Sequence, residues 1–186
     1  MQTITNLRGN RAILLFWRAL VSKMKLGTIF LVCMMVIVSC SEKQPAYKSQ
    51  RVTKLEVDKS DRELRIYNGP DVIRTFDIGL GFSPQGHKKK EGDGKTPHGR
   101  YYIDRKNPFS SFHLSLGISY PNASDKRQAW KRGYSPGGDI MIHGLPNNGK
   151  TPSRRDWTNG CIAVTNAEIE YLYKVVDVGT PIIIYE

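Results

Sequence analysis

The sequence predicts a mainly β domain with one helix packed on its sheet. Short segments alternate apolar and polar residues, turn-forming residues separate these segments, and one stretch alone combines a helical apolar period with an N-terminal cap. The chain has 186 residues, of which 39% are hydrophobic, which is enough for one domain with appendages. Two full domains are not expected.

The first strands are expected at residues 52–58, 63–68 and 72–80, where apolar and polar residues alternate. The turn sequences KSDR and GP divide these three segments, which favours an antiparallel meander. Further strand-like segments are residues 100–104, 112–118, 139–144 and 181–186.

One helix is expected after Thr165, because Glu168 follows three residues later in a capping-box pattern. The apolar residues that then fall at helical spacing are Ile169, Leu172, Tyr173 and Val176. Their stripe is expected to dock on the sheet.

The N-terminal region, residues 1–40, has the pattern of a secretory signal. Lys25 precedes an apolar run of thirteen residues, 26–38, which is too short for an ordinary spanning helix. Ser39 and Cys40 follow this run, and the segment resembles the lipobox of bacterial lipoproteins, in which the signal is cut before a cysteine that carries lipid. Cys40 is therefore the predicted lipidation site.

Two alternatives remain open for this region. An uncleaved membrane anchor is one, since a second apolar patch lies at residues 13–17. Translation from Met24 is the other, because that start gives a conventional signal. In each case the polar residues 41–50 are expected to be a tether, and residues 51–186 a domain outside the cytoplasm.

The charge of the chain is unevenly distributed. Five of its 28 basic residues lie in residues 1–40, which contain no acidic residue, so the net charge of +11 falls to +6 for the remainder. No basic helix with interleaved aromatic residues stands out there. We therefore expect no nucleic-acid partner, and some attraction toward an anionic polymer or membrane face.

The three cysteines are Cys33 in the apolar run, Cys40 at its end and Cys161 in the domain. One cysteine in the exported part excludes a disulfide framework there. A lone thiol in an oxidising compartment is expected to be either buried or used chemically.

A nucleophilic cysteine needs a base and donors for the oxyanion. His143 ends an apolar strand, and 17 residues separate it from Cys161, including a long irregular loop at residues 147–160. The backbone amides of Gly160 and Cys161 are candidate oxyanion donors, since glycine allows close approach. A buried structural cysteine and a core histidine are the alternative interpretation.

Two other kinds of site are disfavoured. The histidines lack the spacing of a zinc site; they are His87, His98, His113 and His143. The sequence GDGKT is not a phosphate-binding loop, because Lys89 stands where the first glycine is needed and Pro97 interrupts the helix that should follow.

The pairing of IHG with TNGCIAVTNAEIEYLY resembles the catalytic core of the L,D-transpeptidases of the YkuD type. Their pattern is a His-Gly, a loop, and then Ser/Thr-His-Gly-Cys. The segment GDGKTPHGRYYI, residues 92–103, is similar to the family's upstream Thr-Pro-x-Gly block. The resemblance covers residues 51–186 and implies a β-sandwich-like catalytic domain with a helix alongside, with no metal or organic cofactor.

The resemblance also implies a peptidoglycan L,D-transpeptidase reaction. Cys161 would be the nucleophile and His143 its base, oriented by the carbonyl of Gly144. The thiolate would attack the stem peptide at the third-position diamino acid and release D-alanine. An amine of a second stem peptide or an envelope protein would then form the cross-link, on the periplasmic side of the cell envelope, in a protein with a lipid anchor.

The sequence departs from the family pattern at two positions. Asn159 replaces the second histidine, and an amide hydrogen-bonds but does not titrate. Ala163 replaces an arginine, so Arg154 or Arg155 is the candidate that holds a substrate carboxylate.

Three further residues are predicted around the thiol. Trp157 and Thr158 are expected to line a groove with Tyr120 as its far wall, although a core role for each aromatic residue is equally open. Two other functions are kept beside the transpeptidase: hydrolysis of the same acyl-enzyme, and a peptidoglycan-binding lipoprotein without chemistry.

Overall fold

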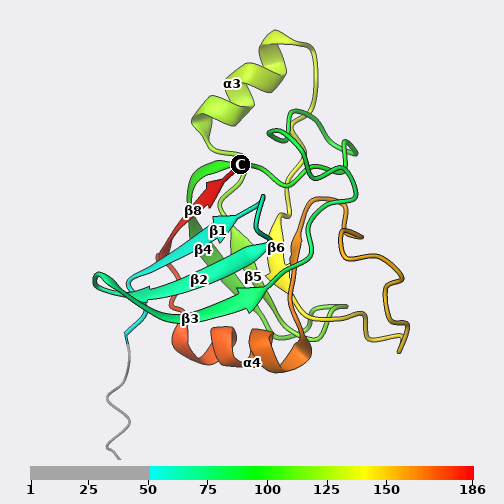
Figure 1. The fold of residues 1–186 in the computed structure, drawn as a ribbon. Helices are drawn as coiled ribbons and strands as arrows, with labels where there is room; N and C mark the ends of the chain where they lie inside the picture. The colour runs from blue at the N-terminus through cyan, green and yellow to red at the C-terminus, as the bar shows by residue number, and fades with distance from the viewer. Residues whose placement is uncertain (1–50) are drawn as a thin grey trace, which may run out of the picture. The chain divides into compact units, whose positions relative to one another are not determined.

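The computed structural model describes residues 51–186 as one curled sheet of eight strands with two helices (Figure 1). The predicted signal, the Met24 start, the lipidation at Cys40 and the tether 41–50 lie outside the described residues. No helix within residues 51–186 has both the length and the apolar character that crossing a bilayer requires. The predicted mainly β fold is confirmed.

The predicted antiparallel meander is present. It consists of β1 (Lys54–Asp58), β2 (Glu63–Asn68) and β3 (Asp71–Asp77). In β1 the side chains of Leu55 and Val57 are fully buried, while their neighbours are partly exposed. This period of two is the reason that alternating residues form a strand with one face in the core.

The C-terminal strand joins this meander to the rest of the sheet. It is β8 (Pro181–Tyr185), and it pairs parallel with β1 and antiparallel with β4 (Gly99–Asn107). From β4 the sheet continues through β5 (Ser115–Ile118), β6 (Met141–His143) and β7 (Ile162–Ala163). The strand order is β3-β2-β1-β8-β4-β5-β6-β7.

The sheet curls because β4 pairs with β8 at one end and β5 at the other, with a register shift between Ile103 and Arg105. This division gives the predicted sandwich-like character. The segment that follows β3 meets β7 through Gly79 and Ala163, whose amides and carbonyls exchange two hydrogen bonds of 2.8 Å. Gly79 is required there, since a Cβ would lie 2.3 Å from the carbonyl oxygen of Arg155.

The predicted helix is α4 (Asn166–Val175). The Thr165 side chain accepts from the amide of Glu168, whose carboxylate accepts in turn from the amide of Thr165. Ile169 and Leu172 are fully buried against the sheet. The capping box and the apolar stripe therefore act as the sequence predicts.

The second helix, α3 (Ala123–Lys131), was not predicted, and it projects from the end of the sheet (Figure 1). Only Asp125 and Ala129 are buried in it, so it has no apolar stripe to detect. Its capping box, formed by Asn122 and Asp125, is the signal that identifies it.

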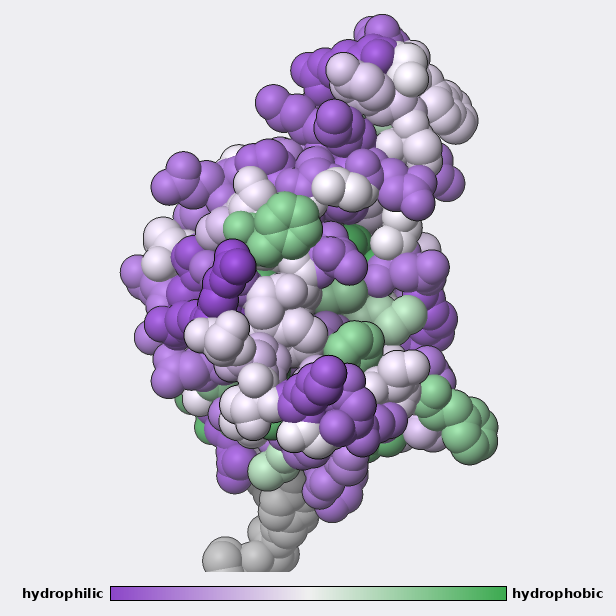
Figure 2. Space-filling view, turned by 90° about the vertical axis from the view of Figure 1, so that its right-hand side faces the viewer, coloured by the Kyte–Doolittle hydropathy of each residue, from purple (hydrophilic) through white to green (hydrophobic). Residues whose placement is uncertain are grey.

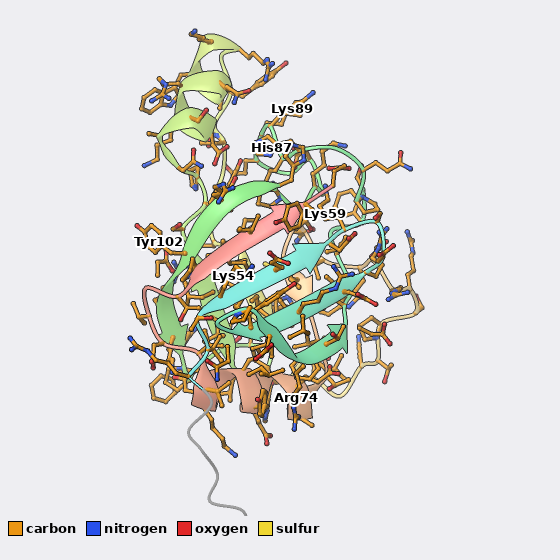
Figure 3. All side chains as sticks on the ribbon, turned by 60° about the vertical axis from the view of Figure 1, so that its left-hand side comes forward. Lys54, Lys59, Arg74, His87, Lys89 and Tyr102 are labelled. Carbon is orange, nitrogen blue, oxygen red and sulfur yellow. The ribbon has the colours of Figure 1, made fainter. Side chains whose placement is uncertain are left out.

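The segment between β3 and β4 crosses this end of the sheet below α3. His87 lies there with Lys89, above Lys59 at the end of β1 (Figure 3). His87 Nε2 is 3.1 Å from Asp125 Oδ1 of α3, and the buried Lys88 is paired with Asp93 at 2.8 Å. The first contact joins the segment to α3, and the second lies within the segment.

Candidate active site

His143 ends β6, and Cys161 directly precedes β7, the parallel neighbour of β6. The register pairs Ile142 with Ile162 and His143 with Ala163. Both isoleucines are buried in the core, so alternation places the side chains of His143 and Cys161 together on the opposite face. Neighbouring strands are about 4.8 Å apart and two residues span about 6.6 Å, so the two Cα atoms are roughly 8 Å apart diagonally.

The Cys161 thiol is half-buried, and its Sγ lies 3.4 Å from the carbonyl oxygen of Asp139. Burial raises its pKa, and the backbone of Met141 and the charge of Lys88 offset this only in part. The resting thiol is therefore protonated at neutral pH. Within residues 51–186, no hydrogen bond joins it to His143, as is common before substrate binds.

The His143 ring is buried, with 3% exposure, and its Nδ1 lies 2.7 Å from the carbonyl oxygen of Gly144. Because a carbonyl only accepts, Nδ1 carries the proton, and Nε2 of the neutral ring is left free to take one. Burial lowers the pKa of His143, and the bond to Gly144 partly opposes this. The site can thus hold a neutral base beside a neutral thiol.

Two aromatic rings enclose this imidazole. The centroid of Phe112 is 4.5 Å from that of His143, and Trp157 makes an edge contact at 5.5 Å. Phe112 and Trp157 also contact each other at 5.7 Å. They exclude water from the ring and fix its plane.

The turn that carries the thiol differs from the prediction in one respect. Gly160 has φ +128°, and a Cβ there would lie 2.6 Å from the carbonyl oxygen of Lys95, so glycine is required by packing. Its amide donates to Thr158 Oγ1 at 3.1 Å and is not an available oxyanion donor. The amide of Cys161 has no partner within residues 51–186 and remains available.

Thr158 does not line a groove, which corrects that expectation, and Tyr120 takes the core role that the sequence left open beside a groove wall. Thr158 is buried, because its hydroxyl donates to the carbonyl of Cys161 inside the turn. Tyr120 is 5% exposed in the hydrophobic core, its hydroxyl donates to the carbonyl of Pro136, and its ring meets Tyr101. Their polar atoms are satisfied by the protein itself.

Trp157 does line the surface beside the site. It borders a cavity of about 560 Å³ that also touches Phe82 and Arg154. An adjoining hollow of about 250 Å³ reaches from Trp157 and Arg154 to Ala163, the strand partner of His143. The face that carries the loop at residues 147–160 is mostly hydrophilic, with small apolar patches among the hydrophilic residues (Figure 2).

The two candidate arginines differ in their surroundings. Arg155 donates to the carbonyls of Ile78 and Arg62, so its guanidinium is held against the sheet. Arg154 is exposed, borders both hollows, and makes no hydrogen bond or ion pair within residues 51–186. Arg154 is therefore the better placed of the two to receive a carboxylate. Asn159 is exposed beside the turn.

Two residues near the thiol, Asp139 and Lys88, were not predicted from the sequence. Asp139 contributes its carbonyl, in a left-handed conformation with φ +53°, and a backbone contribution leaves no side-chain signal. Lys88 is a buried cation that the sequence shows only as one of three consecutive lysines. No three His, Cys, Asp or Glu residues in the described part of the chain lie together as metal ligands.

A family model and a similar protein both match this chain to the L,D-transpeptidases. The family model described as the L,D-transpeptidase catalytic domain (YkuD) matches residues 53–184. The "Putative L,D-transpeptidase YafK" of Escherichia coli K12 is 31% identical over 129 residues, which are 66% of this chain and 46% of that protein.

Solved structures agree with this match. The helical cell shape determining protein Pgp2 of Campylobacter jejuni is 34% identical with a TM-score of 0.58, over 73% of this chain and 48% of that one. Bd1075 of Bdellovibrio bacteriovorus is 26% identical with a TM-score of 0.53, over 75% and 50%. The chain thus spans about half the length of the relatives it matches.

Proposed function

Because the chain belongs to the L,D-transpeptidase catalytic-domain (YkuD) family, we propose that it is a cysteine-dependent peptidoglycan L,D-transpeptidase. The observation that best supports this is the placement of His143 at the end of β6 and of Cys161 directly before its parallel neighbour β7, with both side chains expected on one face. The bond from His143 Nδ1 to Gly144, which leaves Nε2 free, supports the role of a base.

In the first half of the reaction, Nε2 of His143 takes the proton of the Cys161 thiol. The sulfur attacks the carbonyl carbon of the third-position diamino acid of a stem peptide, and the carbonyl oxygen becomes an oxyanion. The free amide of Cys161 is placed to stabilise that charge. The intermediate collapses to a thioester, and His143 gives its proton to the departing amine of D-alanine.

In the second half, an amine of another stem peptide or an envelope protein attacks the thioester. His143 takes a proton from this amine and returns one to the sulfur as the new amide forms. Each cycle therefore breaks one peptide bond and makes another, which requires no external energy source. The site residues alone complete this proton transfer.

The proposed substrate is supported by the loop at residues 147–160 and by the similar proteins. Arg154 at the edge of both hollows fits a carboxylate of the stem peptide, and Trp157 offers an apolar wall. A similarity to a cell shape determining protein supports peptidoglycan as the polymer. We place the domain on the periplasmic side of the envelope, anchored by lipid at Cys40 as the sequence predicts.

The test is product analysis of the purified chain given a defined tetrapeptide stem in H₂¹⁸O. We expect free D-alanine and a cross-linked dimer detected by mass, and neither product from Cys161→Ala. A tripeptide that carries ¹⁸O at its new carboxylate would instead establish hydrolysis. Binding of the stem without any product would establish the binding protein without chemistry.

A further inference from the structure

Ser115 carries an unpaired buried hydroxyl. Within residues 51–186, its Oγ is the single buried side-chain nitrogen or oxygen atom with no hydrogen-bond partner in the protein. Ser115 begins β5 and has 0% exposure. Buried polar groups are almost always paired, so an unpaired one needs a specific reason.

Its position gives that reason, since Ser115 stands directly opposite His143 in the β5–β6 register. The amide of Gly144 bonds to the carbonyl of Leu114, and the amide of Ile118 bonds to that of Ile140. This pattern makes the Ser115–His143 pair a non-hydrogen-bonded one, in which Cα atoms are about 4.5 Å apart and side chains are closest.

The two side chains also share a face. Their strand neighbours Leu116 and Ile142, which pair with each other, belong to the hydrophobic core. Alternation therefore turns Ser115 to the opposite side, together with His143 and Cys161. The hydroxyl lies beside the candidate base.

The surroundings of His143 contain no compensating charge. Burial and the bond to Gly144 determine its pKa, without a contribution from a charged group. Phe112 and Trp157 cover the ring, and Ala163 is its partner on β7. His113, which packs near Gly144, directs its own ring to Glu170 on α4 at 2.8 Å.

Cys161 is the remaining titratable group on this face. In the tetrahedral intermediate of the proposed reaction its sulfur is bonded to carbon and uncharged, so the buried imidazolium has no thiolate beside it. A neutral dipole that can reorient is then what the protein itself offers to stabilise the imidazolium. The Ser115 hydroxyl rotates freely because no partner holds it.

We infer that Ser115 is a positioning residue for His143, whose hydroxyl turns its oxygen lone pairs toward the ring when the ring becomes charged. The neutral ring does not need this dipole, so the stabilisation acts selectively on the state in which His143 holds the proton. The kinetic consequence rests on the proposed function, whereas the effect on the ring does not.

The first test needs no substrate. We expect Ser115→Ala to lower the pKa of His143 further, as measured by NMR titration of the ring in the full chain. Its unfolding temperature should be unchanged or higher, because the variant removes an unpaired buried hydroxyl.

Ser119→Ala is the matched control. Ser119 follows the same strand, and its hydroxyl accepts from the amide of Tyr102 at 3.0 Å. This variant should lower the unfolding temperature and leave the His143 titration unchanged.

The second test is kinetic. With the tetrapeptide stem, Ser115→Ala should lower kcat about tenfold with KM unchanged, since the dipole that stabilises the charged ring in the transition state is lost. An unchanged His143 titration in Ser115→Ala would overturn the inference, whatever the turnover. A lower unfolding temperature with an unchanged titration would also overturn it, by assigning the hydroxyl a structural partner. Absence of turnover by the native chain would count against the proposed function alone.

Discussion

Thr158 and Cys161 are joined across the turn that carries the thiol, with the Thr158 hydroxyl donating to the Cys161 carbonyl at 2.7 Å. The hydroxyl oxygen of Thr158 also accepts a hydrogen bond from the amide of Gly160, at 3.1 Å. One buried hydroxyl therefore fixes the backbone on both sides of Cys161. The direction of the sulfur depends on a buried side chain.

Replacing Thr158 by valine keeps the shape of the side chain and removes both hydrogen bonds. We expect Thr158→Val to lower the free energy of unfolding by about 1–3 kcal/mol, because two buried backbone groups lose their partner. Thr158→Ser retains the hydroxyl and should stay near the native value. Urea denaturation measures the difference, and equal midpoints for valine and threonine would contradict the assigned bonds.

Gly160→Ala should destabilise the fold by about 2–4 kcal/mol, from left-handed backbone strain and from overlap with the carbonyl of Lys95. Gly149→Ala is the control, because Gly149 has φ +74° with nothing within 4 Å of a new Cβ. In that variant only backbone strain is added, so we expect it to lower the free energy of unfolding by about 1 kcal/mol. Thermal unfolding of both variants separates the two effects; equal losses would remove the steric argument.

Alkylation of Cys161 by iodoacetamide should be slow at pH 7. Burial raises the pKa of the thiol, so the reactive thiolate is a smaller fraction than in the unfolded chain. The rate should rise with pH and reach half its maximum above the ordinary range for cysteine. Peptide mass analysis separates this site from Cys33 and Cys40, and the urea-unfolded chain is the reference. Fast labelling of the folded protein at pH 7 would indicate a thiolate–imidazolium pair instead.

Acid should weaken the contact between the last residue and β1. Burial alone would raise the pKa of Glu186, but bonds from Lys59, the amide of Gly86 and His98 outweigh it and lower the pKa to about 2. A carboxyl group whose pKa is lowered by folding stabilises the fold at pH values above its ordinary pKa of 4.5. This stabilisation disappears as the pH falls toward 2.

Glu186→Gln should therefore be less stable than the native chain at pH 7, with the difference closing between pH 4.5 and 2. Urea midpoints across this range give the measurement. Glu170→Gln, which removes a surface partner of His113, is the control with little expected change. A difference that stays constant down to pH 2 would argue against the depressed pKa.

Arg154→Ala should raise KM for the stem peptide about tenfold with a smaller change in kcat, because an exposed cation bordering both hollows binds substrate and product alike. Arg155→Ala should mainly lower the unfolding temperature, since its guanidinium bonds to backbone carbonyls. Steady-state kinetics and thermal unfolding of both variants separate the roles. The reverse pattern would assign the carboxylate to Arg155.

Elements with a local signal were predictable from the sequence. The meander alternates residue by residue, and α4 has both a cap and a stripe. In contrast, β7 has only two residues, too few for any period, and the parallel pairing of β1 with β8 joins distant parts of the chain. Helix α3 is polar on nearly every side, so its sequence has no apolar pattern that predicts a helix.

The same distinction applies to the site. Cys161 and His143 were selected by residue type, and the family pattern marked Gly144. The sequence does not encode the partner of each polar group, so the amide of Gly160 was assigned to the oxyanion although Thr158 holds it. The place of Tyr120 was left open for a related reason, because an aromatic residue fits a groove wall and a core equally well, and the structure puts it in the core.

The pair of hydrogen bonds between Gly79 and Ala163 links a residue of the N-terminal half to the strand that follows the thiol. Without them β7 would be a two-residue edge with a partner on one side only. The thiol of Cys161 is therefore aligned only after these two distant parts of the chain have come together. We expect a partly folded chain to show no reaction with the substrate, although its thiol can be alkylated, so that turnover of substrate reports completion of the fold.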